Sequence, residues 1–266
     1  MTTRAFYRDL GAGRFESTEL ASGAWDPSVQ HMAAACGLMT RELERHAEEE
    51  GGPAGKRFAR LSFDILGAIP AGRFQVTVET TRPGRTIELI EASMVHEGRA
   101  VLHVRAWRLM TSDTTPLAGI EDEAIPQPAE CEAYPEMDRW PGEYMSAASY
   151  RLSARSRPGR GVVWMTTDVD VVAGEEPSPL AKALSMADTT NGVMPRGNKD
   201  EWLFPNVDFT VHLYRLPEGE WIGFDVRQSI GTDGIGVTST VLHDRRGPYG
   251  RAEQILTVRD RRDKEV

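Results

Sequence analysis

The hydrophobic pattern of residues 28–48 predicts a helix. Its apolar positions recur at three- and four-residue intervals, at Val29, Met32, Ala33, Cys36 and Met39. The first half is apolar nearly all round, so we expect other structure to surround it. The end of the segment, RELERHAEEE at 41–50, is expected to project into solvent. Residues 26–28, Asp-Pro-Ser, provide an expected cap with proline in the first turn.

Four strand patterns follow this helix, each bounded by turn residues. They are RFARLSFDIL (57–66), RFQVTVET (73–80), RTIELIEASMVH (85–96) and AVLHVRAWRLM (100–110). In the second of them, apolar and polar residues alternate, which is typical of a half-buried strand. The first half of the chain is therefore predicted to be one helix followed by four strands.

The second half repeats this order. The helix pattern PLAKALSMAD (179–188) is followed by Thr-Thr-Asn-Gly, which is expected to end the helix, and then by strand patterns at 206–216, 220–230, 235–244 and 250–259. Residues 28–109 and 178–259 each span 82 positions, at an offset of 150. Equal length and equal order indicate a duplicated unit.

The duplication suggests three parts of the chain. Residues 1–110 form the first unit, and residues 145–266 form the second unit, which carries the candidate site. Between them, residues 111–144 hold five of the 16 prolines and many acidic residues. We expect this segment to be a linker that runs over the surface.

Composition narrows the function classes. With 40% hydrophobic residues in 266, the chain can bury a large core without a disulfide or metal. Its net charge of −9 disfavours broad nucleic-acid binding. No apolar run reaches the roughly 20 residues of a membrane span, and no secretory signal is recognisable, so we expect a cytoplasmic protein. Cys36 and Cys131 are expected to be reduced thiols, outside any zinc-ligand spacing.

A helix that is apolar all round and followed by four strands predicts an antiparallel sheet curled around the helix, in the α+β class. This arrangement resembles the hotdog fold, and the duplicated chain resembles the double-hotdog acyl-CoA thioesterases. The matching segments are GAWDPSVQH (23–31), ADTTNG (187–192), the run from Trp202 to Arg227, and GPYGRAEQILTV (247–258). One departure is the His-Met-Ala at 31–33, where related sequences often carry His-Gly-Gly. Two side chains there put any site in the first half in doubt.

The resemblance implies that Asp188, Asn206 and Gln254 hold a catalytic water, with no metal and no cofactor. Asn206 stands where some relatives have threonine. A free aspartate, with a pKa of roughly 3.9, is a weak base at neutral pH. Burial beside Leu184 and Met186 at a helix C-terminus would raise that pKa. The alternative is an exposed aspartate that starts an ordinary turn.

The two amides are supported unequally by the strand patterns. Alternation places Gln254 on an apolar face, where an amide needs a polar partner, either at the site or on the backbone. Alternation places Asn206 on a polar face with Asp208 and His212, unless Pro205 breaks the register. Asp208 and His212 form a rival acid–base pair, although a lone strand histidine is more often structural.

The function implied by the resemblance is hydrolysis of acyl-CoA, or of another acyl thioester, to free acid and thiol, within lipid metabolism. The second helix and adjacent amides are expected to receive the oxyanion. The positions 150 residues before the three site residues are Leu38, Lys56 and Val104, so one site per chain is expected. The alternative is a non-catalytic acyl- or hydrophobic-ligand binder; a hotdog dehydratase is disfavoured, because PLAKALSMAD lacks a histidine. A homo-oligomer formed through sheet edges is compatible with this fold.

Overall fold

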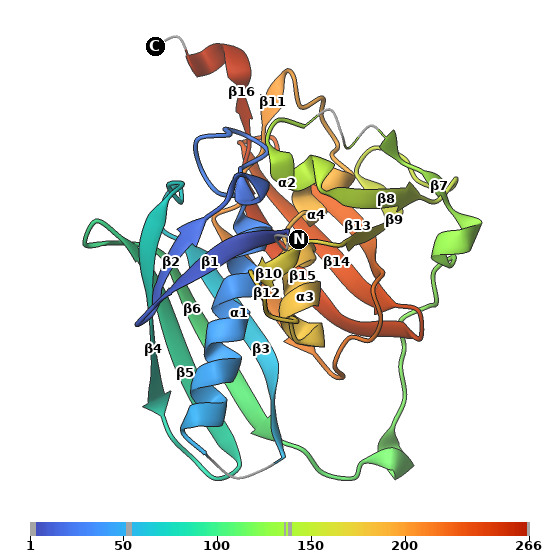
Figure 1. Ribbon diagram of the computed structural model, residues 1–266. Helices are drawn as coiled ribbons and strands as arrows, with labels where there is room; N and C mark the ends of the chain where they lie inside the picture. Colours follow the sequence, from blue (N-terminus) through green and yellow to red (C-terminus); the bar gives the residue numbers. More distant parts are fainter. Residues whose placement is uncertain (1–3, 52–54, 136, 138–139, 265–266) are drawn as a thin grey trace.

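The computed structural model describes residues 4–51, 55–135, 137 and 140–264. Within these residues, one 14-stranded sheet runs through both halves of the chain, and two helices pack together against it (Figure 1). The long helix is α1 (Met32–Glu49), and its counterpart is α3 (Pro179–Ala187). Short helices α2 (Glu143–Ser146) and α4 (Thr190–Val193) lie beside them. None of the described helices is long and apolar enough to cross a membrane.

Six strands of the first half form one side of the sheet, in the order β1-β2-β4-β5-β6-β3. Their bounds are β1 (Ala5–Gly11), β2 (Arg14–Ser17), β3 (Lys56–Ile65), β4 (Arg73–Arg82), β5 (Ile87–His96) and β6 (Arg99–Met110). Neighbours within this group are antiparallel. The predicted helix followed by four strands is therefore confirmed for this half, with β1 and β2 added at the edge.

The second half contributes the order β12-β15-β14-β13-β9-β8-β7. The bounds are β7 (Glu132–Ala133), β8 (Ala148–Leu152), β9 (Arg160–Thr167), β12 (Asp208–Leu213), β13 (Ile222–Ile230), β14 (Ile235–Asp244) and β15 (Gly247–Thr257). Strand β10 (Asp170–Val172) pairs in parallel with β1, and β11 (Trp202–Leu203) pairs with β16 (Arg259–Asp260). Single 3-10 turns lie at Glu19–Ala21, Thr115–Leu117, Pro128–Glu130 and Arg261–Lys264.

The two halves are joined at the middle of the sheet. Strand β3 pairs antiparallel with β12, and the rings of Phe63 and Phe209 lie side by side there, 5.8 Å apart between centroids. On the helical side, α1 and α3 approach closely at Gly37. A Cβ atom added to Gly37 would lie 2.5 Å from the Cβ of Ser185, so only glycine allows this approach. The contact places the end of α3 beside the first half of α1.

Two expectations for the first helix are wrong. Helix α1 begins at Met32, and its N-cap is His31, whose Nδ1 accepts a hydrogen bond from the Ala33 amide at 3.1 Å. Residues 26–28 instead form a turn in which Asp26 accepts from Ser28. The charged second half of α1 is also partly buried. Glu42 is 3% exposed, and its ion pairs with Arg41 and Arg45 offset the cost of burying its charge.

The segment between the halves runs along the second unit. The indole of Trp164 donates a hydrogen bond to the carbonyl of Pro126, and Arg251 pairs with Asp122. Nearer to β8, Trp140 packs edge-on against Phe204 in the core. Because β6 ends at Met110 and β8 begins at Ala148, we propose units 1–110 and 145–266, connected by 111–144.

Candidate active site

Asp188 lies buried at the C-terminal end of α3. It is the C-cap residue of that helix and only 2% of its surface is exposed. The turn predicted after it does end α3, but the chain then forms the short helix α4. The reading of Asp188 as an exposed turn residue is therefore wrong. The close contact between α1 and α3 and the apolar side chains of Leu184 and Met186 keep this end of the helix away from water.

Both predicted amides reach the carboxylate of Asp188. The Nδ2 of Asn206 donates to Oδ1 at 2.7 Å, and the Nε2 of Gln254 donates to the same oxygen at 2.8 Å. Within the described residues, no side chain or amide donates a hydrogen bond to the second oxygen, Oδ2. The three residues predicted from the sequence therefore meet at one oxygen atom, although they come from three segments that are far apart in the chain.

The position of Asn206 departs from the simple strand alternation. Strand β12 begins only at Asp208, and Asn206 precedes it in an isolated bridge with Leu256. Its Nδ2 also donates to the backbone carbonyl of Asp208 at 2.9 Å. Because Asn206 lies outside the regular strand, the alternating polar face does not include it, and its side chain turns towards Asp188.

Gln254 follows the alternation of β15 and lies in the core, 1% exposed. In addition to the Asp188 carboxylate, its Nε2 contacts the backbone carbonyl of Asp188 at 3.1 Å. Its Oε1 accepts from the hydroxyl of Thr190 at 2.8 Å. The buried amide therefore has the polar partners that its burial requires.

Burial raises the pKa of Asp188 to about 7. The hydrogen bonds from Gln254 and Asn206 favour the ionised form and lower the pKa, while the nearby negative charge of Asp208 raises it. Loss of hydration is the largest of these effects. A carboxylate with a pKa near neutrality can accept a proton at pH 7 far better than a solvated aspartate.

A cavity of about 130 Å³ opens beside Asp188 and Asn206, with walls from both halves of the chain. The first half supplies Trp25, Val29, Gln30, His31, Met32 and Ile65, among others. The glycines that are missing at 32 and 33 therefore do not exclude the first half from this site. The sequence signal for this wall was the GAWDPSVQH segment at 23–31. Four of the six residues lie within it, and Met32 follows it directly.

His31 shows how the first half is fitted to this cavity. Its ring stacks on that of Tyr144, with 3.9 Å between centroids and 14° between planes. Burial lowers the pKa of His31 to about 3, so the ring is neutral at pH 7. Since Nδ1 accepts from the Ala33 amide, the proton is on Nε2, which makes that atom a hydrogen-bond donor.

The rival pair on β12 lies elsewhere. Asp208 accepts a hydrogen bond from the backbone amide of Ile255 at 2.7 Å, and His212 is exposed. Neither residue lines the cavity beside Asp188. The pair is therefore part of the solvent side of the sheet rather than of this site.

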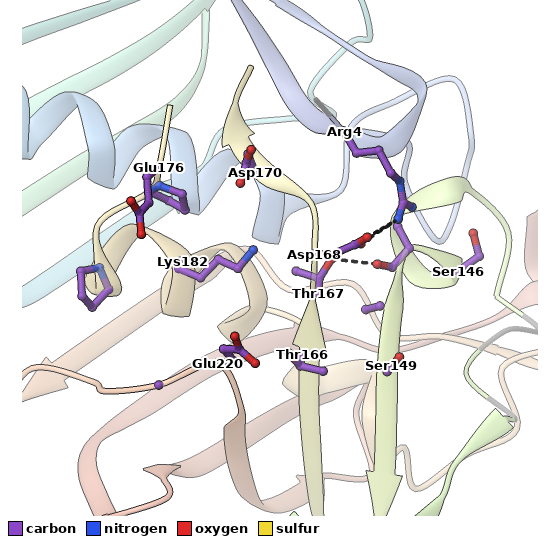
Figure 2. Close-up of a pocket in the computed structure, with 15 residues that line it drawn as sticks. Arg4, Ser146, Ser149, Thr166, Thr167, Asp168, Asp170, Glu176, Lys182 and Glu220 are labelled. Atoms are coloured by element: carbon purple, nitrogen blue, oxygen red, sulfur yellow. Dashed lines mark hydrogen bonds and ion pairs between the residues drawn. The ribbon is translucent and has the colours of Figure 1, made fainter. Parts of the chain in front are cut away.

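A larger cavity, of about 800 Å³, occupies the position related to this site by the 150-residue offset. Pro179 and Lys182 line it, and their counterparts 150 positions earlier, Val29 and Met32, line the cavity beside Asp188. Figure 2 shows Lys182 in this cavity and the ion pair between Arg4 and Asp168. Nη1 of Arg4 lies 2.7 Å from Oδ1 of Asp168. The counterpart of Asp188 is the buried apolar Leu38, so the second unit's carboxylate has no equivalent at this cavity.

Models of one protein family match most of the chain. The acyl-CoA thioesterase N-terminal domain matches residues 21–109, and the acyl-CoA thioesterase C-terminal domain matches residues 128–258. No curated protein sequence matches this chain.

Solved structures with the same fold are similar over nearly the full chain. A putative thioesterase from Novosphingobium aromaticivorans DSM 12444 has a TM-score of 0.71 at 18% identity, covering 95% of this chain and 98% of that one. A putative thioesterase II from Thermobifida fusca YX has a TM-score of 0.69 at 19% identity, covering 97% and 98%. A hot dog fold protein of unknown function from Alicyclobacillus acidocaldarius has a TM-score of 0.73 at 15% identity, covering 96% and 97%.

The fold is therefore a double hotdog of the α+β class, and residues of both halves line the cavity beside Asp188. The predicted fold class is confirmed. This chain belongs to the acyl-CoA thioesterase family, and it is a hydrolase of acyl thioesters.

Proposed function

We propose that this protein hydrolyses acyl-CoA, or a closely related acyl thioester, with water activated by Asp188. The observation that carries the proposal is a buried carboxylate whose Oδ1 accepts from two amides beside a small cavity. Burial raises the pKa of this carboxylate to about 7, so a large fraction is ionised at neutral pH and can take a proton.

The reaction needs a group that accepts a proton from water and a group that donates a hydrogen bond to the oxyanion. The water loses a proton to Asp188 while its oxygen adds to the thioester carbonyl carbon, which leaves the carbonyl oxygen negative. When the tetrahedral intermediate collapses, the C–S bond breaks, and the proton passes from Asp188 to the departing thiolate. The products are a free acid and a thiol, and the base is regenerated. Since the two amides occupy Oδ1, Oδ2 is the oxygen available to the water.

The two amides support the base in this scheme. The amide nitrogens of Asn206 and Gln254 each donate to Oδ1 of Asp188 and to a backbone carbonyl. We therefore assign them the role of holding and orienting the carboxylate. The family resemblance implies that these two amides also contact the catalytic water. This stays a prediction, and the side-chain oxygens of Asn206 and Gln254 would make the contact through their remaining lone pairs.

The start of α1 is the better place for the oxyanion. Helix α3 meets the cavity with its C-terminal end, where carbonyl groups rather than N–H groups point outward. The second helix, α3, therefore does not receive the oxyanion in this scheme, contrary to the expectation from the sequence. Met32, the first residue of α1, and His31, whose Nε2 is a hydrogen-bond donor, line the cavity. The positive end of the α1 dipole favours a negative oxygen there.

The second candidate is a ligand-binding protein without turnover, which the His-Met-Ala departure at 31–33 favours. A panel of acyl-CoA chain lengths separates the two. We expect saturable release of free thiol, detected with a thiol reagent, for at least one chain length. Binding measured by calorimetry without thiol release at any chain length would support the second candidate. The same panel run with pantetheine and carrier-protein thioesters identifies the thiol group that the protein accepts.

A further inference from the structure

Two neighbouring residues of α4 contact the amides that hold Asp188. The hydroxyl of Thr190 donates to Oε1 of Gln254 at 2.8 Å, and Nδ2 of Asn191 donates to Oδ1 of Asn206 at 3.4 Å. Thr190 is fully buried, and Asn191 is 7% exposed. Each residue therefore supplies a donor to the oxygen end of one amide.

Backbone carbonyls determine which way the two amides point. Nε2 of Gln254 contacts the carbonyl of Asp188 at 3.1 Å, and Nδ2 of Asn206 contacts the carbonyl of Asp208 at 2.9 Å. A carbonyl only accepts hydrogen bonds, so the NH₂ group of each amide must face it. The second hydrogen of each NH₂ group then points to Oδ1 of Asp188, and the amide oxygens point towards α4.

The donors on α4 are constrained in the same way. Nδ2 of Asn191 also contacts the carbonyl of Phe204 at 3.3 Å, which fixes it as the donor end of that side chain. The Thr190 hydroxyl can donate or accept, but it faces an amide oxygen and therefore donates. The network is closed: every hydrogen of the Gln254 and Asn206 amide nitrogens has an acceptor, and each amide oxygen has a donor.

We propose that Thr190 and Asn191 are positioning residues that keep both amides turned with their NH₂ groups towards Asp188, so that the carboxylate can serve as the base. This inference rests on the proposed role of Asp188. Without the Thr190 hydroxyl, Oε1 of Gln254 is buried without a donor, which is unfavourable. A Gln254 amide without this anchor is held less firmly, which weakens the hydrogen bond from its Nε2 to the ionised carboxylate. Removing the hydroxyl therefore favours the protonated form of Asp188.

The other ionisable groups around Asp188 do not mask this effect. Burial raises the pKa of Cys36 on α1 and of Tyr144 on α2 well above their usual values, and it lowers the pKa of His31 to about 3. None of these three groups changes charge between pH 5 and 8. Asp208 adds a nearby negative charge that raises the pKa of Asp188 in wild type and variants alike.

The test compares Thr190→Val, which removes the hydroxyl at nearly constant volume, with Thr190→Ser, which keeps it. The dependence of kcat/KM on pH is measured for both, and the pKa of Asp188 is measured by carboxyl ¹³C NMR, with Asp188→Asn to assign the signal. We expect the acid limb and the NMR titration of Thr190→Val to move up by about one pH unit, which corresponds to about a tenfold loss well below the pKa. Thr190→Ser should stay within about twofold of wild type.

Unchanged pH limbs and an unchanged Asp188 titration in Thr190→Val would overturn the inference. If Thr190→Val does not fold, Asn191→Ala tests the other amide with the same two measurements. The NMR titration does not depend on hydrolysis. If Asp188→Asn kept full activity, the base assignment would fail, while the titration would still report whether Thr190 orients Gln254.

Discussion

Gln254 and Asp188 are 66 positions apart in the chain, yet Nε2 of the amide lies 2.8 Å from Oδ1 of the carboxylate. Both side chains are almost fully buried. The amide offsets part of the cost of burying the charge, but the loss of hydration is larger, so the pKa of Asp188 is about 7. This relationship leads to testable effects on pH dependence, stability and packing.

The pH dependence of hydrolysis should follow the ionisation of Asp188. The base is active only when it is ionised, so kcat/KM should rise with pH through about 7 and level off above it. The measurement is kcat/KM for one acyl-CoA substrate between pH 5 and 9. A flat profile across this range would show that another group, or none, acts as the base.

Asp188 should also make folding stability depend on pH. Its pKa is about 7 in the folded protein and roughly 3.9 in the unfolded chain, so the folded state binds the proton more tightly. The stability that protonated Asp188 provides is fully present below about pH 4 and is lost as the pH rises through about 7. Asp188→Asn removes this loss, because asparagine does not ionise. The free energy of unfolding of the variant minus that of wild type, measured with urea, should therefore be larger at pH 8 than at pH 5 by on the order of 2 kcal/mol. Equal differences at the two pH values would contradict the buried, raised-pKa carboxylate.

His31 should remain neutral throughout the physiological range. Burial against Tyr144 lowers its pKa to about 3, and its Nδ1 caps α1. In NMR titrations its imidazole signals should stay constant between pH 5 and 8. His31→Ala should cost about 1 kcal/mol of stability through loss of the cap. A His31 titration near pH 6.5 would show that the ring is solvated.

The contact between α1 and α3 should be sensitive to one methyl group. A Cβ at Gly37 would overlap the Cβ of Ser185, so Gly37→Ala should destabilise the protein by about 1–3 kcal/mol in urea unfolding, despite the better helix propensity of alanine. The double variant Gly37→Ala with Ser185→Gly restores the space and should recover part of that loss. Additive losses in the double variant would show that the helices do not meet at this point.

The architecture could be predicted from the sequence because the pattern of the chain is local. The spacing of apolar residues predicts α1 and the strands from short stretches of sequence. The repeat of the same order of elements 150 residues later then indicates the duplication. Gln254 could be placed for the same reason, since β15 is regular and its alternation holds. Asn206 could not be placed by alternation, because the register of β12 starts two residues later.

The remainder of the site depends on contacts between distant segments. The wall from Trp25 to Met32 lies beside Asp188 only because α1 and α3 pack across Gly37. Likewise, the sequence places Thr190 in the segment that ends a helix. Its contact with Gln254, 64 residues later in the chain, is visible only in the structure. Periodicity along one strand or helix carries no information about such pairs.

The most direct test of the central claim is thiol release from acyl-CoA by Asp188→Asn, beside Asp168→Asn as the matched control. Asp168 is an exposed aspartate paired with Arg4 at the other cavity, so its change removes one carboxylate without touching the base. We predict that Asp188→Asn lowers kcat by at least about 100-fold at pH 8, the usual contribution of a general base, while Asp168→Asn stays within about twofold of wild type. Full activity of Asp188→Asn, with the wild-type pH profile, would contradict the account.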